Sequence, residues 1–142
     1  MSTHLETLSR PGGELKREPA DRDEFDGLVR TAIARLRDAG NRQLSLESRF
    51  DLAYNAAHAL CLAATRRLGY RPQKRYIVFQ SLPHTLQLGP DVWRLLDRCH
   101  EKRNLAEYEG FLDVNETLVD ELIAATQRVA DALSQLPAPE PD

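Results

Sequence analysis

The chain has 142 residues, of which 42% are apolar and 29% charged, the usual balance of a globular protein. This length favours a single domain with a substantial core. The formal net charge of −3 argues against a protein that coats itself with nucleic acid, although a local basic patch is compatible with it. No run approaches the roughly 20 apolar residues of a membrane span, and the N-terminal residues lack the apolar stretch of a secretory signal. We therefore expect a cytoplasmic protein that does not enter a membrane.

Composition shifts predict three regions. Residues 1–20 mix prolines, glycines and charges without a sustained apolar period, which predicts a flexible N-terminal arm. Residues 21–136 carry helical periodicity and form the predicted domain. Residues 137–142, which begin with Pro137, form a predicted disordered tail.

The helices are expected in chain order over 21–39, 45–68, 74–82, 90–109 and 114–136. The segment 45–68 gives the strongest signal, because Ser45 is a good N-cap and apolar residues recur at intervals of three and four. Its many alanines would let a neighbour approach closely, so we expect it at the centre. Residues 76–79 could also begin a strand, but no second strand is apparent to pair with it. The fold predicted is all-α, an up-and-down bundle of four to five helices.

Cysteines and histidines give no sign of a metal or cofactor. Cys61 and Cys99 have no CxxC spacing and are expected to be small core residues. The four histidines, at positions 4, 58, 84 and 100, are scattered, which argues against a metal site. His58, among alanines, is expected in the core or at a helix seam. We expect no cofactor.

Arg103 stands on the apolar stripe of the helix predicted over 90–109, where the pattern calls for an apolar residue. A charge there needs a partner, a dimer seam or a cleft, since burying it unpaired would be costly. The simplest partner is Glu107, one turn later, with Tyr108 packed at the helix end. Tyr108 itself lies about 140° from Arg103 around an ideal helix, so the two meet only if the helix bends or both line a groove.

Two segments resemble the HEPN family, compact helical proteins found beside minimal nucleotidyltransferases and in toxin–antitoxin and defence systems. They are SLESRFDLAYNAAHALCLAATRRLGYRP, residues 45–72, and RCHEKRNLAEYEG, residues 98–110, with VFQSLPHTLQL between them. The family motif is an Arg, commonly followed by Asn or another polar residue, and then a His after four to six residues. Arg103 and Asn104 match its first part, but Tyr108 stands where the His would be.

This resemblance implies a HEPN-like homodimer in which two motif helices face one another, so that each Arg103 lies near its counterpart. Active relatives resemble metal-independent ribonucleases, in which a His moves a proton and an Arg holds the phosphoryl oxygens. Tyr, with a pKa of about 10, is a poor base at neutral pH. Arg103, Asn104 and Tyr108 are therefore expected to bind phosphate, with catalysis in doubt. His100, three residues before Arg103, is the candidate that could replace the missing His, although a surface histidine is the commoner outcome.

A basic cluster follows the second helix, and its members are Arg66, Arg67, Arg71, Lys74 and Arg75. Such residues compensate a helix dipole at its C-terminal end, and they could also hold RNA or an acidic partner. The first interpretation is favoured unless the cluster lies beside Arg103 in space. The candidate binding residues are Arg103, Glu107, Arg71, Lys74 and Arg75.

Three functional hypotheses follow. The leading one is a HEPN-like homodimer that binds RNA, a nucleotide or a nucleotidyltransferase-type partner in a toxin–antitoxin or defence context. The second is an active endoribonuclease of the same fold, using Arg103 with Tyr108 or His100. The third is a structural interaction module in which Arg103 pairs with Glu107 and no ligand binds.

Overall fold

The structure is a computed structural model that describes residue 5 and residues 14–141, and it is predominantly helical, as predicted. Four long helices and two single-turn helices accompany two three-residue strands in the described part of the chain. In chain order the elements are β1 (Leu15–Arg17), α2 (Arg22–Ala39), α3 (Leu46–Arg67), β2 (Tyr70–Pro72), α4 (Ile77–Gln80), α5 (Leu82–Thr85), α6 (Pro90–Glu109) and α7 (Glu116–Ser134).

Capping side chains at the N-terminal ends and a glycine at one C-terminal end set the limits of the long helices. Asp21 caps α2 by accepting from the backbone N–H groups of residues 23 and 24, and Ser45 caps α3 by accepting from that of Ser48. Asn115 does the same for α7. At the end of α6, Gly110 adopts φ 82°, a left-handed conformation that glycine reaches without a steric penalty. The boundaries of these helices therefore agree with the sequence-based prediction to within two residues.

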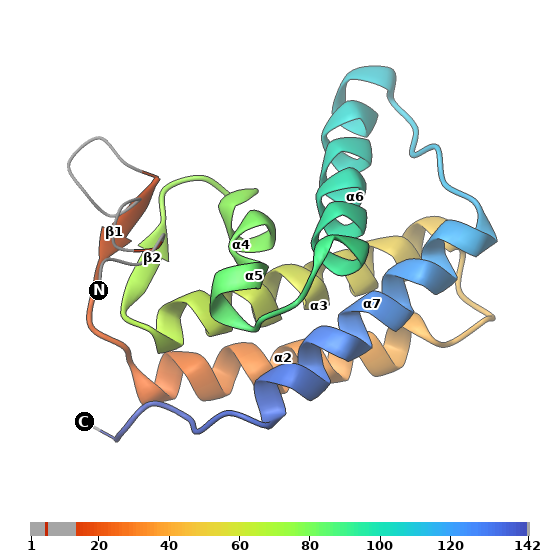
Figure 1. Cartoon of the computed structure of the whole chain (residues 1–142). Helices are drawn as coiled ribbons and strands as arrows, with labels where there is room; N and C mark the ends of the chain where they lie inside the picture. Colours follow the sequence, from red (N-terminus) through yellow and green to blue (C-terminus); the bar gives the residue numbers. More distant parts are fainter. Residues whose placement is uncertain (1–4, 6–13, 142) are drawn as a thin grey trace.

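Helices α2, α3 and α7 lie side by side, and α6 rises steeply from this layer (Figure 1). α3 is central, with a buried run of alanines that lets α2 and α7 approach closely. The C-terminal half of α6 projects beyond the other helices (Figure 1). The expectation of an up-and-down bundle therefore needs modification, because the long helices do not run alongside one another over their full lengths.

The N-terminal prediction differs from the structure in the part that is described. Leu15–Arg17 form a strand that pairs antiparallel with Tyr70–Pro72, in the register Leu15 to Pro72 and Arg17 to Tyr70. Residues 15–20 are thus fixed on the domain, where a flexible arm was expected. The pairing was missed because each strand has only three residues and neither shows alternation. Residues 1–4 and 6–13 of the predicted arm lie outside the described residues.

The predicted tail also makes contacts with the helices. The side chain of Arg67 donates to the carbonyl oxygen of Pro137 at 2.7 Å, and that of Arg22 donates to Pro139 at 3.2 Å. Residues 137–141 therefore run along the ends of α2 and α3 rather than leaving the domain as the disordered tail predicted. Residue 142 is outside the described part.

The segment 74–82, predicted as one short helix, is two separate turns. α4 ends at Gln80 and α5 starts at Leu82. Pro83 is in the first turn of α5, where its lack of an N–H group is harmless, whereas the same residue would break a continuous helix. The buried residues Ile77, Val78 and Phe79 anchor α4. In the described part of the chain, no helix is both long and apolar enough to cross a membrane.

Gly27, within α2, offers a direct test of helix propensity. A Cβ atom built at this position meets nothing within 4 Å, so Gly27→Ala is expected to raise the free energy of unfolding by about 0.5–1 kcal/mol. The matched control is Gly110→Ala, which also has open space but a φ of 82°. That substitution is expected to cost about 1 kcal/mol. Urea denaturation followed by circular dichroism measures the free energy of unfolding of both variants. A change of the same sign and size in the two variants would contradict this account.

Candidate functional site

An aromatic cluster joins α3, α4 and α6 beneath the projecting half of α6. Tyr54 from α3 is buried, with 1% of its surface exposed, and its ring centroid lies 6.2 Å from that of His100 in α6. Phe79 from α4 lies 6.0 Å from Tyr54 and 6.1 Å from His100. His58, one turn after Tyr54 on α3, meets the Phe79 ring edge-on at 6.1 Å. These four rings bring three separate segments of the chain together.

His100 is held through both ring nitrogens. Its Nδ1 lies 2.8 Å from the Tyr54 hydroxyl oxygen, and its Nε2 lies 3.0 Å from the side-chain nitrogen of Asn104. With the Asn104 amide nitrogen facing it, Nε2 of the neutral ring accepts and Nδ1–H donates to Tyr54. The ring is therefore fixed in orientation, with an accepting nitrogen directed at an exposed amide. His100 was expected more often as a surface residue, but it is buried.

Two guanidinium groups from different elements lie over the Tyr54 ring. The Arg103 carbon Cζ is 5.3 Å from the ring centroid, and that of Arg75, between β2 and α4, is 5.8 Å from it. Both distances fall within the range of cation–π attraction. The partner of Arg103 on the apolar side of α6 is thus Tyr54, with Asn104 beside it on the same helix.

Burial and these cations shift the pKa values of the cluster. Burial, followed by Arg75, His100 and Arg103, lowers the pKa of His58 to about 4. Burial also lowers the pKa of His100; Asp97 opposes this shift, and Arg75 and Arg103 add to it. Both imidazoles are consequently neutral at pH 7. Burial raises the pKa of the Tyr54 hydroxyl, although the two guanidinium groups act in the opposite direction.

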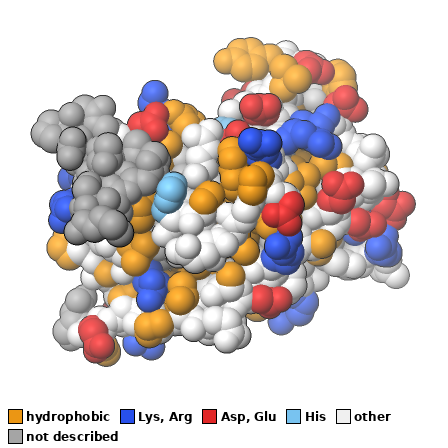
Figure 2. All heavy atoms as spheres, in the orientation of Figure 1, with side chains coloured by type: hydrophobic (Ala, Val, Ile, Leu, Met, Phe, Trp, Pro, Cys, Tyr) orange, Lys and Arg blue, Asp and Glu red, His pale blue; other side chains and the backbone are white. Residues whose placement is uncertain are grey.

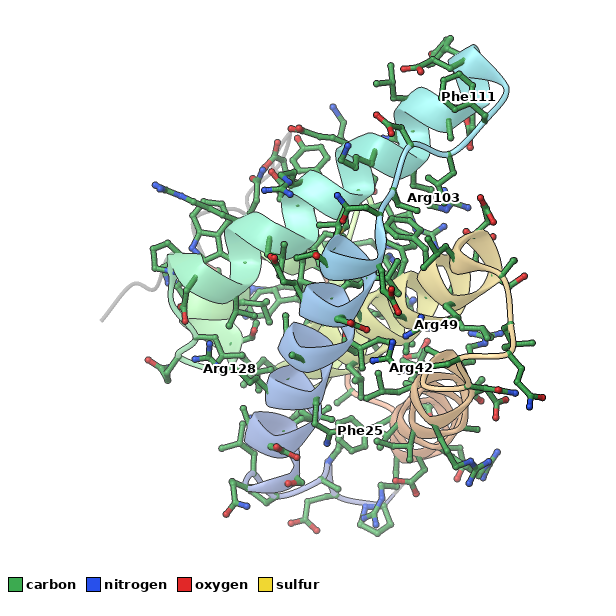
Figure 3. All side chains as sticks on the ribbon, turned by 90° about the vertical axis from the view of Figure 1, so that its right-hand side faces the viewer. Phe25, Arg42, Arg49, Arg103, Phe111 and Arg128 are labelled. Carbon is green, nitrogen blue, oxygen red and sulfur yellow. The ribbon has the colours of Figure 1, made fainter. Side chains whose placement is uncertain are left out.

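Glu107 lies beside Arg103 without closing it off. The closest approach of an Arg103 guanidinium nitrogen to a Glu107 carboxylate oxygen is 3.9 Å, and the two side chains are 32% and 70% exposed. This ion pair, predicted from the spacing, is present but loose. Arg103 also lines an open hollow of about 260 Å³, and the residues around it are Glu47, Asp51, Arg103, Ala106, Glu107 and Leu112. Figure 3 shows Arg103 in the space between α6 and the start of α3.

Tyr108 does not take the place expected for it next to Arg103. Its side chain is 88% exposed, and it makes no hydrogen bond or ring contact with any residue of the described ranges. The prediction that it packs at the helix end is therefore wrong. α6 continues without interruption to Glu109, so Tyr108 and Arg103 lie on different sides of it.

The residues of the basic cluster at and after the end of α3 have different partners and do not form one site. Arg66 is buried and bonded to Glu24 at 2.7 Å, and Arg71 bonds to Glu18 at 2.7 Å and to Glu24 at 2.6 Å. These carboxylates lie on α2 and beside β1, so Arg71 is a structural residue and not part of a site with Arg103. Lys74 is exposed in the connection between β2 and α4. Only Arg75 is brought to the aromatic cluster.

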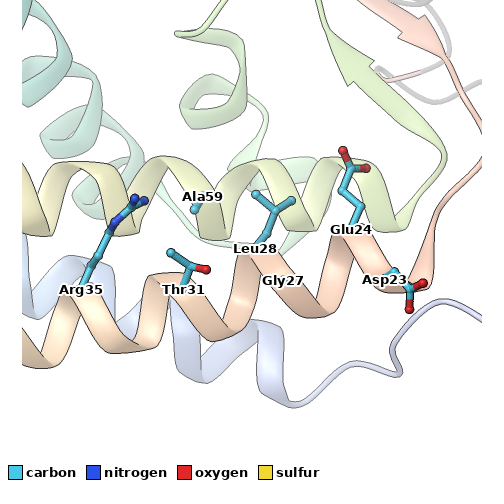
Figure 4. A pocket seen from close by; sticks show the side chains of 7 residues that line it. All are labelled: Asp23, Glu24, Gly27, Leu28, Thr31, Arg35 and Ala59. Carbon is cyan, nitrogen blue, oxygen red and sulfur yellow. The ribbon is translucent and has the colours of Figure 1, made fainter.

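Two further hollows lie on the α2 side of the domain. One, of about 340 Å³, has Asp23 and Glu24 at one end and Arg35 at the other, with Gly27 and Thr31 between them (Figure 4). The other, of about 280 Å³, is almost wholly apolar and lies between α2 and α7, near Phe25 and Leu133. Glu24 is already engaged by Arg66 and Arg71, and neither hollow joins groups suited to acid–base chemistry.

Two of the arginines labelled in Figure 3, Arg42 and Arg49, hold elements of the fold together. Arg49 is buried and donates to the Ala39 carbonyl oxygen at 2.9 Å and to Asp120 at 3.2 Å, which ties α3 to α2 and α7 (Figure 3). Arg42 extends this network to Glu116 at 2.6 Å. Within residue 5 and residues 14–141, no three His, Cys, Asp or Glu side chains are grouped to hold a metal ion. Cys61 and Cys99 are buried free thiols, as predicted.

Sequence reasoning missed Tyr54 and Phe79. Tyr54 appears in the sequence as one aromatic residue in an alanine-rich helix, and Phe79 as part of an apolar run, so neither carries a spacing signal. Comparisons of the chain with protein-family models, with curated proteins and with solved structures find no match. The case for function therefore depends on the geometry around Arg103.

Proposed function

We propose that this protein binds RNA, with a phosphate group held by Arg75, Arg103 and Asn104. The observation that carries the proposal is the convergence of two guanidinium groups on the Tyr54 ring, beside the His100–Asn104 pair. Arg75 forms no ion pair with another residue of the described ranges, and Arg103 has only the loose contact with Glu107. By contrast, Arg66 and Arg71 have carboxylates within 2.7 Å.

The physical basis is the geometry of guanidinium and phosphate. A guanidinium group presents several N–H donors in one plane, which suits the oxygens of a phosphate, and the Asn104 amide adds another donor. The 3.9 Å contact with Glu107 is long for a charge-assisted hydrogen bond, so a phosphate can replace it at small cost. The open hollow beside Arg103 argues against the purely structural alternative, which requires Arg103 to be enclosed.

The HEPN resemblance supports the same ligand and adds a homodimer. In such an arrangement the α6 helices of two copies face one another, so two Arg103 side chains would share one groove. Apolar side chains gather at the projecting end of α6 (Figure 2), where Leu105 is 53% and Phe111 61% exposed. We therefore propose a two-fold dimer in a toxin–antitoxin or defence context, with a nucleotide or a nucleotidyltransferase-type protein as the alternative ligand. Sedimentation equilibrium measures the dimer directly.

Removal of either cation is expected to weaken RNA binding. Arg103→Ala and Arg75→Ala should each lower the affinity for a fluorescent RNA oligonucleotide by about tenfold, since each removes a charged phosphate contact. Each should also reduce the slope of log affinity against log salt concentration by about 0.7. The matched control is Arg128→Ala, which removes an exposed arginine paired with Asp91 at 2.6 Å. Fluorescence anisotropy measures all three, and equal losses in the three variants would refute a localised site.

Cleavage of the bound RNA is a second candidate function, favoured by the position of His100. Its neutral imidazole lies three residues before Arg103 and is oriented by Tyr54, so a small shift of Asn104 would free Nε2 to take a proton. Incubation of purified protein with mixed RNA in EDTA tests this, with His100→Gln and Arg103→Ala beside wild type. Both substitutions should reduce cleavage by about 10²–10⁴-fold, whereas Tyr108→Phe should leave it unchanged. Intact RNA with wild type would leave binding as the sole function.

A further inference from the structure

Tyr54, on α3, lies beneath both arginines of the proposed phosphate site. The Cζ atoms of Arg103 and Arg75 are 5.3 and 5.8 Å from its ring centroid, so one ring joins a cation of α6 to a cation of the connection before α4. Two guanidinium groups repel each other, and a long side chain at the surface has many rotamers. The ring attracts both groups, which offsets the repulsion and restricts their movement. The arginines are therefore held near one another before a ligand binds.

Arg75 shows this dependence on the ring most clearly. It is exposed in the connection between β2 and α4, where no regular backbone structure orients its side chain. Within residue 5 and residues 14–141 it forms no ion pair with a carboxylate, so the ring of Tyr54 is what orders it. A phosphate that binds an ordered arginine loses less free energy to side-chain entropy than one that must order the arginine first.

The hydroxyl group of Tyr54 acts on the third donor of the site, Asn104. A buried hydroxyl needs a hydrogen-bond partner, and that of Tyr54 lies 2.8 Å from Nδ1 of His100. With Nδ1–H donating to the hydroxyl oxygen, Nε2 of His100 accepts from the amide nitrogen of Asn104 at 3.0 Å. That contact uses one amide hydrogen, and the second remains for a phosphate oxygen. Tyr54 thus orients Asn104 through His100.

Phe50 shows that packing alone does not require these contacts. It lies one turn before Tyr54 on α3, is fully buried, and its ring is nearly parallel to that of Tyr54 with the centroids 6.2 Å apart. A phenyl ring without a hydroxyl is sufficient for the core at this level of the helix. The hydroxyl bond and the two cation contacts of Tyr54 are therefore additional to its part in the core.

We propose that Tyr54 is the positioning residue of the phosphate site, whose ring sets the places of Arg75 and Arg103 and whose hydroxyl, through His100, orients the amide of Asn104. This inference rests on the proposed function and deepens it. Tyr54 is 1% exposed, so its effect on RNA is transmitted by the side chains around it. The two parts of the effect are separable, because phenylalanine keeps the ring and lacks the hydroxyl.

Two substitutions separate the ring from the hydroxyl. Tyr54→Leu removes both and is expected to lower the affinity for a fluorescent RNA oligonucleotide by about tenfold, because RNA must then order two arginines. Tyr54→Phe should lower it by no more than about threefold, through the loss of one neutral hydrogen bond. Phe50→Leu is the matched control, since it removes an equally buried ring of the same helix, and it should change affinity by less than about twofold. Circular dichroism establishes that each variant is folded.

A double-mutant cycle distinguishes positioning from a general loss of packing. In an Arg103→Ala background the effect of Tyr54→Leu on affinity should fall from about tenfold to about threefold, because one of the two arginines it orders is already absent. A packing defect would keep its full effect in that background. If Tyr54→Leu does not fold, Tyr54→Met takes its place in the cycle, because the flexible methionine side chain adapts to irregular space.

The hydroxyl is tested without RNA. Nitrogen-15 NMR of the His100 imidazole should show the Nδ1–H tautomer in wild type and in Phe50→Leu, and a shift toward the Nε2–H tautomer in Tyr54→Phe, where Nδ1–H has no acceptor. A general change in the core would not select one ring nitrogen.

Three outcomes would overturn parts of this assignment. Equal losses of affinity in Tyr54→Leu and Phe50→Leu, or a loss that stays about tenfold in the Arg103→Ala background, would overturn the role of the ring. An unchanged His100 tautomer in Tyr54→Phe would overturn the role of the hydroxyl. Failure of wild type to bind RNA would refute the proposed function itself, and the NMR spectra would still decide whether Tyr54 orients His100.

Discussion

Replacement of Arg66 by alanine is expected to lower the free energy of unfolding by about 3–5 kcal/mol, because it leaves buried partners without their cation. Arg66 is only 2% exposed, and its Nε donates to Glu24 at 2.7 Å. Its other nitrogens donate to the backbone carbonyl oxygens of Glu18, Pro19 and Tyr70. One side chain therefore connects α3, α2, β2 and the segment after β1.

The pKa of Glu24, the acidic residue of this network, shows how strongly its carboxylate depends on the two arginines. Burial by itself would raise the pKa of Glu24, but hydrogen bonds from Arg71 and Arg66 hold that pKa below its usual value. Without Arg66, the carboxylate keeps only Arg71 and loses part of this stabilisation. Three carbonyl oxygens would also lose a donor, and the bond to the Tyr70 carbonyl oxygen is buried.

Arg67 provides the control at the next position in the chain. Its side chain makes one exposed hydrogen bond, to the carbonyl oxygen of Pro137, so Arg67→Ala is expected to cost no more than about 1 kcal/mol. Urea denaturation at pH 7, followed by circular dichroism, gives both free energies. If Arg66→Ala were no more destabilising than Arg67→Ala, the buried network would not be the connection described here.

Acidification is expected to destabilise the fold through His58. Its pKa is about 4 in the folded protein, against about 6.5 in an unfolded chain, because burial and then Arg75, His100 and Arg103 oppose its charge. The unfolded state therefore binds a proton first as the pH falls. The stability linked to the neutral ring is complete above pH 6.5 and is lost progressively toward pH 4. Down to pH 4.5 the loss is at most about 3 kcal/mol.

The measurement is the free energy of unfolding at pH 7 and pH 4.5 for wild type and His58→Leu. Leucine cannot take up a proton, so the variant should lose about 2–3 kcal/mol less than wild type on acidification. Titrating groups that do not act on His58, Glu24 among them, are common to both proteins and cancel in the comparison. Parallel loss in the two proteins would mean that His58 is accessible to solvent and titrates normally.

Much of the helical architecture could be predicted from local pattern. Ser45, Asp21 and Gly110 act through groups a few residues away, so their effect on helix ends can be recognised in one dimension. The strand Leu15–Arg17 could not be found in this way. Its partner is more than fifty residues away, and three residues are too few to show alternation. The steep course of α6 likewise depends on packing against α4 and α7 rather than on its own sequence.

The candidate site was likewise predictable from the sequence only in part. The odd phase of Arg103 drew attention to α6, and the spacing correctly predicted its ion pair with Glu107. Tyr54, the ring beneath Arg103, comes from α3, and Arg75 comes from a connection between two other elements. No rule of spacing relates these positions, because their proximity follows from how α3, α4 and α6 pack. Arg71, which was predicted to belong to the site, instead forms ion pairs with Glu18 and Glu24, and this too follows from the packing of the elements.

The sequence by itself determined that the chain is helical, where the long helices begin and end, and that Arg103 is out of place on an apolar stripe. These properties depend on interactions between residues within one or two turns. The tertiary structure decided which cations remain available. Arg66 and Arg71 meet carboxylates brought in by α2 and the segment after β1, whereas Arg75 and Arg103 meet an aromatic ring. A guanidinium over a ring keeps its charge unneutralised, and for that reason the phosphate site is proposed there.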